Sequence, residues 1–517
     1  MTTVFFVFLV LILNIPFLNA KVKLPAILSD NMVLQADKTI KIWGTADSKE
    51  KITIIIENQK VSETADENGK WMVKLAPVKA GGPYQMNVEG EKDTITIKNI
   101  LIGEVWLGSG QSNMSIAVGN VMNASEEISN ANYPMIRLFG VKNNSSLKPL
   151  DNVEGSWVEC SPQTVKWFSA VSYFFGRYLH TKLNTPVGLI ASAWPGTPAD
   201  PWTSNETFEN NTDLKPIFDK LEQFIIQENN GENKKKIDEY ERKLKEWEEL
   251  SKIKEPENTG KIIPPKPVNP FRFPSAPTIL YNAMISPITS FAIKGVIWYQ
   301  GESNANRAYQ YRKLFPAMIE GWRKAWDDDF PFLFVQLANF MPKKTEPAQS
   351  AWAELREAQL MTLSIPNTAM AVIIDIGDTT DIHPKNKQDV GMRLALPALA
   401  KVYGKKDIVY SGPIYKSMKI EENKIRLYFD HIGSGLGVQN SAELVGFAIA
   451  GEDKKFLWAK AVIDGNTIVV SNENVAKPVA VRYAWADNPD CNLYNKEKLP
   501  ASPFRTDDWE GITYNNK

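Results

Sequence analysis

The chain has 517 residues, 43% of them hydrophobic, which is enough for roughly three globular domains. Its formal net charge of −1 gives no sign of a basic face for phosphates, so we expect no nucleic acid partner. The three histidines are scattered and the two cysteines, Cys160 and Cys491, lie far apart, so no metal site is expected. Whether the two cysteines pair stays open.

The first twenty residues are predicted to be a secretory signal peptide. Residues 4–17 form an almost uninterrupted apolar run, too short for a comfortable membrane span, and the small residue Ala20 before Lys21 suits cleavage. We expect cleavage near Ala20 and export to the periplasm or the extracellular space, with an uncleaved anchor as the alternative. No later segment is long and apolar enough to span a bilayer.

Residues 21–99 are predicted to form an N-terminal β-sandwich. Residues 39–43 and 51–56 alternate or cluster β-forming side chains, and residues 65–70 supply a turn before the next such run. Short strands at this spacing are typical of a small sandwich. The region contains no cluster of catalytic residue types, so we expect it to pack against the rest of the chain or face a carbohydrate.

Residues 100–404 are predicted to form a parallel sheet covered by helices on both faces. Apolar runs that read as buried strands alternate with stretches of helical spacing, the strands at 100–106, 187–193, 294–301, 332–337 and 370–375 and the helices at 168–183, 309–326 and 387–403. In such folds ligands gather beyond the carboxyl ends of the strands. The residues that follow each run are therefore the candidates for a site.

Two further regions depart from this pattern. Residues 211–270 combine a charged segment with one apolar helical face and a proline-rich stretch, which indicates a hairpin or lid inserted in the predicted α/β domain. Lysines 234–236 are expected to be a solvated face. Residues 405–517 are strand-like again, which predicts a C-terminal β domain.

Ser112 is the candidate nucleophile. The strand at 100–106 runs into residues 107–114, Leu-Gly-Ser-Gly-Gln-Ser-Asn-Met, a tight turn that lifts Ser112 where the backbone is most exposed. Glycines there allow the close approach of a reacting carbonyl, and the Ser112 amide would donate to a developing oxyanion if a helix starts at Asn113. The alternative is an ordinary helix N-cap.

His383 is the favoured general base. It lies in the loop after the strand that ends at Asp375, on the edge of the sheet where Ser112 is expected. His180 falls within an apolar helix and His431 within the C-terminal β domain. A carboxylate on the other ring nitrogen would fix the tautomer, and the candidates from residue types and positions are Asp378, Asp381 and Glu302. A main-chain carbonyl is a further alternative.

Four ordered blocks carry a resemblance to a known family. Residues 110–114, 192–197, 298–304 and 381–384 resemble blocks of the sialate O-acetylesterase family within the SGNH-hydrolase superfamily, and the similarity extends to segments near both ends of the mature chain, 28–35 and 482–489. The resemblance implies an SGNH-type, flavodoxin-like α/β domain flanked by N-terminal and C-terminal β domains. It also implies Ser112 as nucleophile, His383 as base and Gly196 as a backbone oxyanion donor.

The sequence departs from the superfamily at two places. Thr380 stands three residues before His383, where the superfamily has its aspartate, and the Gln-Gly-Glu block of related carbohydrate acetylesterases suggests Glu302 as principal acid with Asp381 as auxiliary. Pro195 stands where relatives often have glycine; it lacks an amide hydrogen, which leaves Gly196 as the donor.

The side-chain oxyanion donor is expected to be Gln300 ahead of Asn304. Together these features predict an exported serine esterase that removes O-acetyl groups from sugars, with sialic acids as the expected substrate class and no cofactor. An acetylesterase of xylan or another plant polysaccharide is the alternative enzyme. A carbohydrate-binding protein without turnover is the alternative of another class. The sugar position and the oligomeric state stay open.

Overall fold

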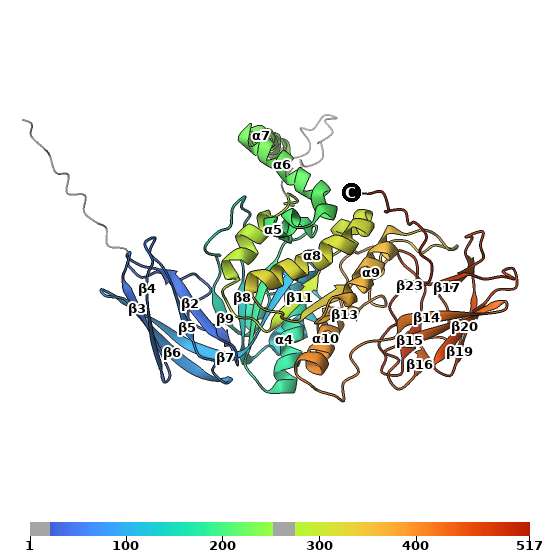
Figure 1. Ribbon diagram of the computed structural model, residues 1–517, viewed down its shortest axis with the longest axis horizontal. Coiled ribbons are helices and arrows are strands. Elements are labelled where there is room, and N and C mark those ends of the chain that lie inside the picture. Colours follow the sequence, from blue (N-terminus) through green and yellow to red (C-terminus); the bar gives the residue numbers. More distant parts are fainter. Residues whose placement is uncertain (1–20, 252–273, 517) are drawn as a thin grey trace, which may run out of the picture.

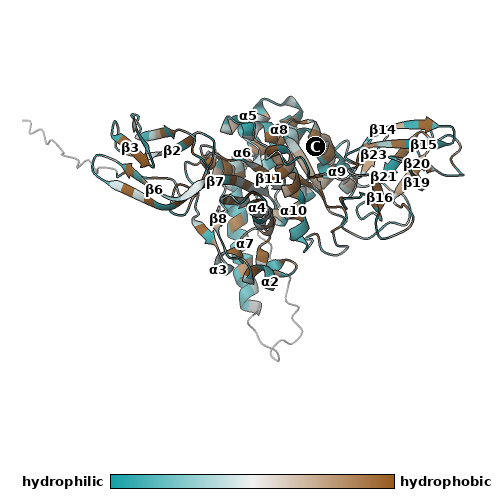
Figure 2. Cartoon of the chain, turned by 90° about the horizontal axis from the view of Figure 1, so that it is seen from below, coloured by the Kyte–Doolittle hydropathy of each residue, from teal (hydrophilic) through white to brown (hydrophobic). Residues whose placement is uncertain are grey.

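The computed structural model describes residues 21–251 and 274–516, so the predicted signal peptide and most of the proline-rich stretch of the insertion lie outside the described residues. Three regions follow one another along the longest axis of the molecule: N-terminal strands, a central α/β body and C-terminal strands (Figure 1). The same order is visible from below, where the strands at both ends carry hydrophilic as well as hydrophobic residues (Figure 2). The predicted architecture, an α/β domain between two β regions, is confirmed.

The N-terminal region contains six strands before it reaches the central body: β1 (Val33–Gln35), β2 (Ile40–Thr45), β3 (Lys51–Ile56), β4 (Gln59–Thr64), β5 (Lys70–Leu75) and β6 (Gly81–Glu89). Strands β2 and β5 pair with each other, while β3 pairs with β4 and β6, all antiparallel. The alternation predicted for β3 is present, because Ile52, Ile54 and Ile56 are buried and the residues between them are not.

Strand β7 (Thr94–Gly110) connects the N-terminal region to the central body without a linker. Its first half pairs antiparallel with β6, residues 101–103 pair with β1, and its second half lies between two parallel neighbours. Its burial changes from partial exposure to complete burial at Ile100. This is the pattern expected when one strand passes from a sheet with a solvated face into a sheet covered on both faces.

The central sheet has the strand order β13-β12-β11-β7-β10-β8-β9. All of its neighbours are parallel except the edge pair β8–β9. Besides β7, the strands of this sheet are β8 (Tyr133–Gly140), β9 (Trp157–Cys160), β10 (Val187–Ala193), β11 (Gly295–Tyr299), β12 (Phe332–Gln336) and β13 (Thr368–Val372). Chain order reverses around β7, so a crevice at its carboxyl end is the favoured ligand position.

Helices cover both faces of this sheet. On one face Trp106 of β7 packs edge-on against Phe175, which belongs to α4 (Ala170–Leu183). On the other face Trp298 of β11 contacts Phe315 and Trp322 of α8. The helices of the two layers are α4 with α10 (Lys387–Pro397), and α8 (Ala308–Trp326) with α9 (Ala351–Met361). The predicted parallel sheet with two covered faces is confirmed.

The insertion forms helices that project from the central body (Figure 1). They are α6 (Lys215–Asn229) and α7 (Glu232–Ser251), whereas the short α5 (Asn205–Glu209) precedes the insertion and packs on α8. Lysines 234–236 are exposed on α7, as predicted for a solvated face. None of the helices in the described ranges combines the length and the apolar character that a bilayer crossing requires.

The C-terminal region has its own hydrophobic core. Its strands are β14 (Ile414–Glu421), β15 (Lys424–Asp430), β16 (Leu436–Val438), β17 (Phe447–Ala450), β18 (Leu457–Trp458), β19 (Lys460–Asp464), β20 (Thr467–Ser471), β21 (Ala480–Tyr483), β22 (Leu493–Asn495) and β23 (Phe504–Arg505). The fully buried Arg356 of α9 ties it to the central body by donating to carbonyl oxygens of residues 337, 338, 486 and 487. Cys160 and Cys491 are unpaired thiols.

Candidate active site

The turn after β7 places Ser112 at the carboxyl end of the central sheet. Gly110 has φ +137°, and a Cβ atom there would lie 2.2 Å from the carbonyl oxygen of Tyr299, so only glycine fits. The Gln111 amide donates to that same carbonyl at 3.1 Å. The short helix α1 (Ser112–Ser115) begins at once, one residue earlier than predicted. Two adjacent strands thereby fix the backbone that carries Ser112.

His383 lies beside Ser112. Its Nε2 is 3.0 Å from the Ser112 Oγ, a hydrogen-bond distance between residues 271 positions apart. His383 comes from the loop between β13 and α10, as the sheet-edge argument predicts. The other two histidines are engaged elsewhere: His180 Nδ1 bonds the Thr185 carbonyl, and the His431 ring packs on Tyr410.

Asp381 faces the other nitrogen of the imidazole. Its Oδ1 lies 3.3 Å from His383 Nδ1 and accepts a hydrogen bond from the His383 amide at 2.9 Å. Asp378 shapes the loop, since its carboxylate accepts from the backbone amides of Thr380 and Asp381. This local turn folds the chain back far enough for a carboxylate only two residues away to reach the ring.

Glu302 does not face the imidazole. Its Oε1 accepts a hydrogen bond from Asn113 Nδ2 at 2.6 Å, and its Oε2 is buried without a partner among the described residues. It begins the 3₁₀ helix η6 (Glu302–Arg307), which follows β11. The geometry therefore reverses the ranking expected from the sequence, in which Glu302 is the principal acid and Asp381 the auxiliary.

Two backbone amides remain available for an oxyanion. Gly196 lies in the turn after β10, with φ +73°, and the register pairs Ala193 with Gly110 while the Trp194 amide bonds the Gly110 carbonyl at 3.1 Å. The turn is therefore at the same sheet edge as Ser112. Within the described part of the chain, neither the Ser112 amide nor the Gly196 amide donates to an acceptor.

The two predicted side-chain donors, Gln300 and Asn304, are already bonded within the protein. Gln300 is fully buried, and its Nε2 has acceptors at Asn304 Oδ1, Gln111 Oε1 and the Thr197 carbonyl. Asn304 Nδ2 donates to the buried Asp200, which also pairs with Arg307. Both Nε2 hydrogens of Gln300 are used within the protein, which disfavours Gln300 as the oxyanion donor, whereas Asn304 Nδ2 uses one hydrogen on Asp200. Gln300 bonds the Thr197 carbonyl and Asn304 Oδ1 accepts from the Ala199 amide, so both residues hold the chain that follows Gly196.

Burial of the imidazole favours its neutral form. Burial is the main cause that lowers the pKa of His383 below its ordinary 6.5; Asp381 opposes this, and Lys385 and Lys387 reinforce it. Burial by itself would raise the pKa of Asp381, but bonds from the His383 amide and from Lys385 outweigh it and lower the pKa. The site therefore holds a carboxylate beside an imidazole that is neutral near pH 7.

Sequence reasoning did not single out Lys387 or assign a role to Asn113. Lys387 is fully buried at the start of α10, and its Nζ donates to Asn113 Oδ1 at 2.5 Å. Asn113 Nδ2 donates in turn to the carbonyl of Ile382 at 3.0 Å. The sequence shows that Lys387 follows His383 by four residues. Neither the residue type nor its neighbours in the sequence predict that this lysine is buried.

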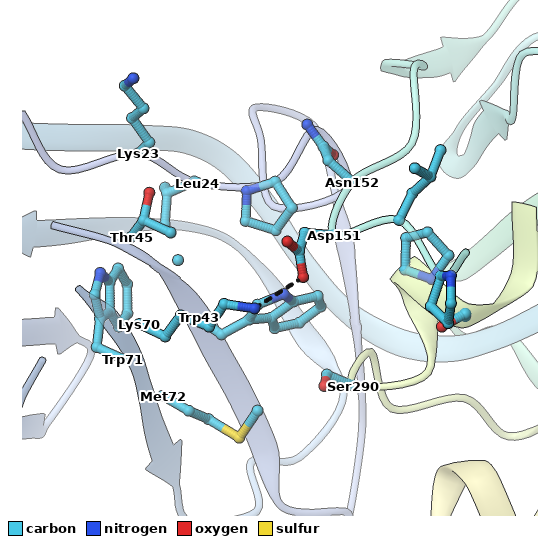
Figure 3. Close-up of a pocket in the computed structure, with 16 residues that line it drawn as sticks. Lys23, Leu24, Trp43, Thr45, Lys70, Trp71, Met72, Asp151, Asn152 and Ser290 are labelled. Carbon is cyan, nitrogen blue, oxygen red and sulfur yellow. Dashed lines mark hydrogen bonds and ion pairs between the residues drawn. The ribbon is translucent and has the colours of Figure 1, made fainter. Parts of the chain in front are cut away.

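A pocket of about 630 Å³ lies elsewhere, between the N-terminal strands and loops of the central body (Figure 3). Trp43 and Trp71 lie in its wall, and the Lys70–Asp151 ion pair joins its two sides at 3.0 Å. Neither Ser112 nor His383 lines it. Within residues 21–251 and 274–516, no group of three or more histidine, cysteine or acidic side chains is arranged to hold a metal ion.

Comparisons with known proteins agree on one family. A family model described as carbohydrate esterase, sialic acid-specific acetylesterase, matches residues 271–400. The sialate O-acetylesterases of Mus musculus and Homo sapiens are both 31% identical to this chain, over 92% of it and 92% and 91% of their own lengths. A solved structure of a carbohydrate acetylesterase from Xanthomonas citri is 37% identical, covers 95% of this chain and 100% of its own, and superposes with a TM-score of 0.80. The resemblance carried by the four sequence blocks is confirmed, and the chain belongs to the sialate O-acetylesterase family.

Proposed function

We propose that the chain hydrolyses acetyl esters of sugars through a covalent acyl-enzyme, with Ser112, His383 and Asp381 as the catalytic group. The observation that carries this proposal is the 3.0 Å contact between Ser112 Oγ and His383 Nε2, with Asp381 on the opposite ring nitrogen. Nucleophile, base and orienting acid in this order are the arrangement that serine hydrolases need, whatever their fold.

The chemistry follows from these positions. With its Nδ1 proton directed to Asp381, His383 keeps the Nε2 lone pair for the Ser112 proton. Ser112 Oγ attacks the acetyl carbon, and the imidazolium gives its proton to the sugar oxygen as the ester bond breaks. Water then attacks the acetyl-serine while His383 takes a proton from it, and the imidazolium returns that proton to Ser112 Oγ as acetate leaves. The amides of Ser112 and Gly196 are suited to bind both oxyanions, because neither has an internal acceptor.

The proposed substrates are O-acetylated sialic acids, and the support is the names of the mammalian relatives. The name of the Xanthomonas citri enzyme specifies only a carbohydrate acetylesterase, so acetylated xylan is the second candidate. Acetate release from O-acetylated sialic acid and from acetylated xylan, at matched ester concentration, decides between them. The Ser112→Ala variant is the control for background hydrolysis. Release from neither substrate would contradict the proposal.

We also propose that the chain is exported and loses its first twenty residues. The support is the apolar run at 4–17 followed by Ala20. Intact-mass measurement of protein from the culture medium or periplasm should then find an amino terminus at or near Lys21. Full-length chain recovered with the membrane fraction would show an anchor instead.

A further inference from the structure

Three polar side chains form a hydrogen-bonded connection next to Ser112. Asn113 is at its centre: its Oδ1 accepts from Lys387 Nζ at 2.5 Å, and its Nδ2 donates to Glu302 Oε1 at 2.6 Å. Asn113 is 1% exposed and Lys387 is 0% exposed. The three residues come from α1, η6 and α10, which are separate parts of the chain.

Asn113 also joins the two segments that carry the nucleophile and the base. It follows Ser112 directly in α1, and its Nδ2 donates to the carbonyl of Ile382, the residue before His383, at 3.0 Å. One side-chain amide thus sets the separation between the backbone at Ser112 and the backbone at His383. A shift of this amide would change the 3.0 Å distance between Ser112 Oγ and His383 Nε2, on which proton transfer depends.

Burying an ammonium and a carboxyl group here is costly unless each has partners. The Lys387 ammonium lies 5.1 Å from the centre of the Tyr299 ring and bonds Asn113, while Glu302 Oε2 has no partner among the described residues. Burial lowers the pKa of Lys387 to about 7 and raises that of Glu302. A hydrophobic pair of similar size would avoid this cost, so the polar pair is best explained by what it does to Asn113.

We propose that Asn113 is a positioning residue that sets the Ser112–His383 separation, and that Glu302 and Lys387 act on catalysis by fixing the Asn113 amide. The inference rests on the proposed function, because it assigns these residues to the same reaction. Neither Glu302 nor Lys387 touches Ser112 or His383 in the described contacts. The arrangement gives the buried glutamate of the Gln-Gly-Glu block a role other than orienting the imidazole.

The test is epistasis measured with one aryl acetate. Asn113→Ala should lower kcat by about a hundredfold, the loss expected from misplacing reacting groups by about 1 Å, and leave KM within about twofold. Glu302→Gln should lower kcat about tenfold in the wild-type chain and less than about twofold in the Asn113→Ala chain, because its effect passes through the missing amide. At a pH well above 6.5, where His383 is neutral with or without the Lys387 charge, Lys387→Met should behave like Glu302→Gln.

Lys401→Met is the matched control. Lys401 follows α10 and, in the described contacts, donates only to the Thr368 carbonyl and not to Asn113. The kcat of the Lys401→Met variant should therefore stay near that of the wild type. If Asn113→Ala does not fold, Glu302→Gln and Lys387→Met replace it. The variant that combines these two substitutions should then have a kcat no lower than that of the less active single variant. Losses that multiply, or single variants with wild-type kcat, would overturn the inference. Turnover by Ser112→Ala would instead overturn the proposed function.

Discussion

The two segments that meet at Ser112 differ in how their polar groups are used. The loop between β13 and α10 is half-exposed, with the side chains of His383 and Asp381 at 34% and 40% of their full accessibility. In the segment after β11, Gln300 and Asn304 are buried and their side-chain amides donate hydrogen bonds within the protein. The groups proposed to move and orient the proton lie in the loop, whereas Gln300 and Asn304 hold the backbone in place.

The largest effect should come from the groups of the loop and the nucleophile turn. Ser112→Ala and His383→Ala should each lower kcat by about 10⁴-fold or more, and the double variant should lose no more than either one, because nucleophile and base act as a unit. Steady-state kinetics on an acetyl ester, with thermal melting to show that the variants fold, checks this. Either folded variant with near-wild-type turnover would contradict the assignment of the site.

The second effect separates the two carboxylates. Asp381→Asn should lower kcat by about 10²- to 10³-fold. This is less than the loss of about 10⁴-fold for the acid of a serine protease, because the Asp381–His383 distance of 3.3 Å is longer than an ordinary hydrogen bond and both side chains are partly exposed. Glu302→Gln should cost only about tenfold, since it acts on Asn113.

Kinetics on both carboxylate variants with the same ester decides this comparison. Equal losses would mean that the buried segment takes part in proton transfer. A larger loss for Glu302→Gln would restore the order expected from the sequence.

The sequence predicted the positions of these residues better than their contacts. Parallel strands bring their carboxyl ends to one edge, so Ser112, Gly196 and His383 could be placed together from apolar runs alone. The direction of the Glu302 side chain depends on how η6 starts after Gly301, whose φ is +153°, and no periodicity encodes that. The reach of Asp381 depends on the turn built by Asp378, a set of local bonds that strand and helix patterns do not describe.

The fold shows the same limit at larger scale. Alternating apolar runs predicted the central sheet and both β regions. They did not predict that β7 would cross residue 99 unbroken, because the composition changes there while the backbone pairing continues on new partners. Nor did they predict Arg356, whose burial is supported by four carbonyl acceptors supplied by two regions far apart in sequence.

A smaller effect on kcat is expected from the C-terminal region, which contacts the loop between β13 and α10. Asn488 is 2% exposed and its Nδ2 donates to Thr379 Oγ1 at 3.1 Å and to the Met341 carbonyl at 2.7 Å. Asn488→Ala removes both hydrogen bonds, each worth about 0.5–1.5 kcal/mol, so it should cost about 1–3 kcal/mol in the free energy of unfolding and lower kcat about threefold. Denaturant unfolding and kinetics on one preparation measure both.

Asn472→Ala is the control for Asn488→Ala, since Asn472 bonds the Trp458 carbonyl within the C-terminal region. It should leave kcat unchanged. A kcat loss of equal size in both variants would show that the C-terminal region acts through general stability and not through the loop.

The smallest effect concerns pH and tests the charge around the loop. His383 must be neutral to accept the Ser112 proton, and burial lowers its pKa, so the acid limb of kcat/KM should have its midpoint below 6.5. Lys385 lowers this pKa further by repulsion, and it also pairs with Asp381 at 3.3 Å, which weakens the opposing carboxylate. Both effects have the same sign, so Lys385→Gln should move the midpoint upward.

An exposed charge pair is worth about 0.2–1 kcal/mol, which corresponds to about 0.1–0.7 pH units at about 1.36 kcal/mol per unit. Added salt should shrink the difference between Lys385→Gln and wild type, because exposed charges are screened. A midpoint above 6.5 in the wild-type chain, or a downward shift in Lys385→Gln, would mean that burial and Lys385 do not control the protonation of the imidazole.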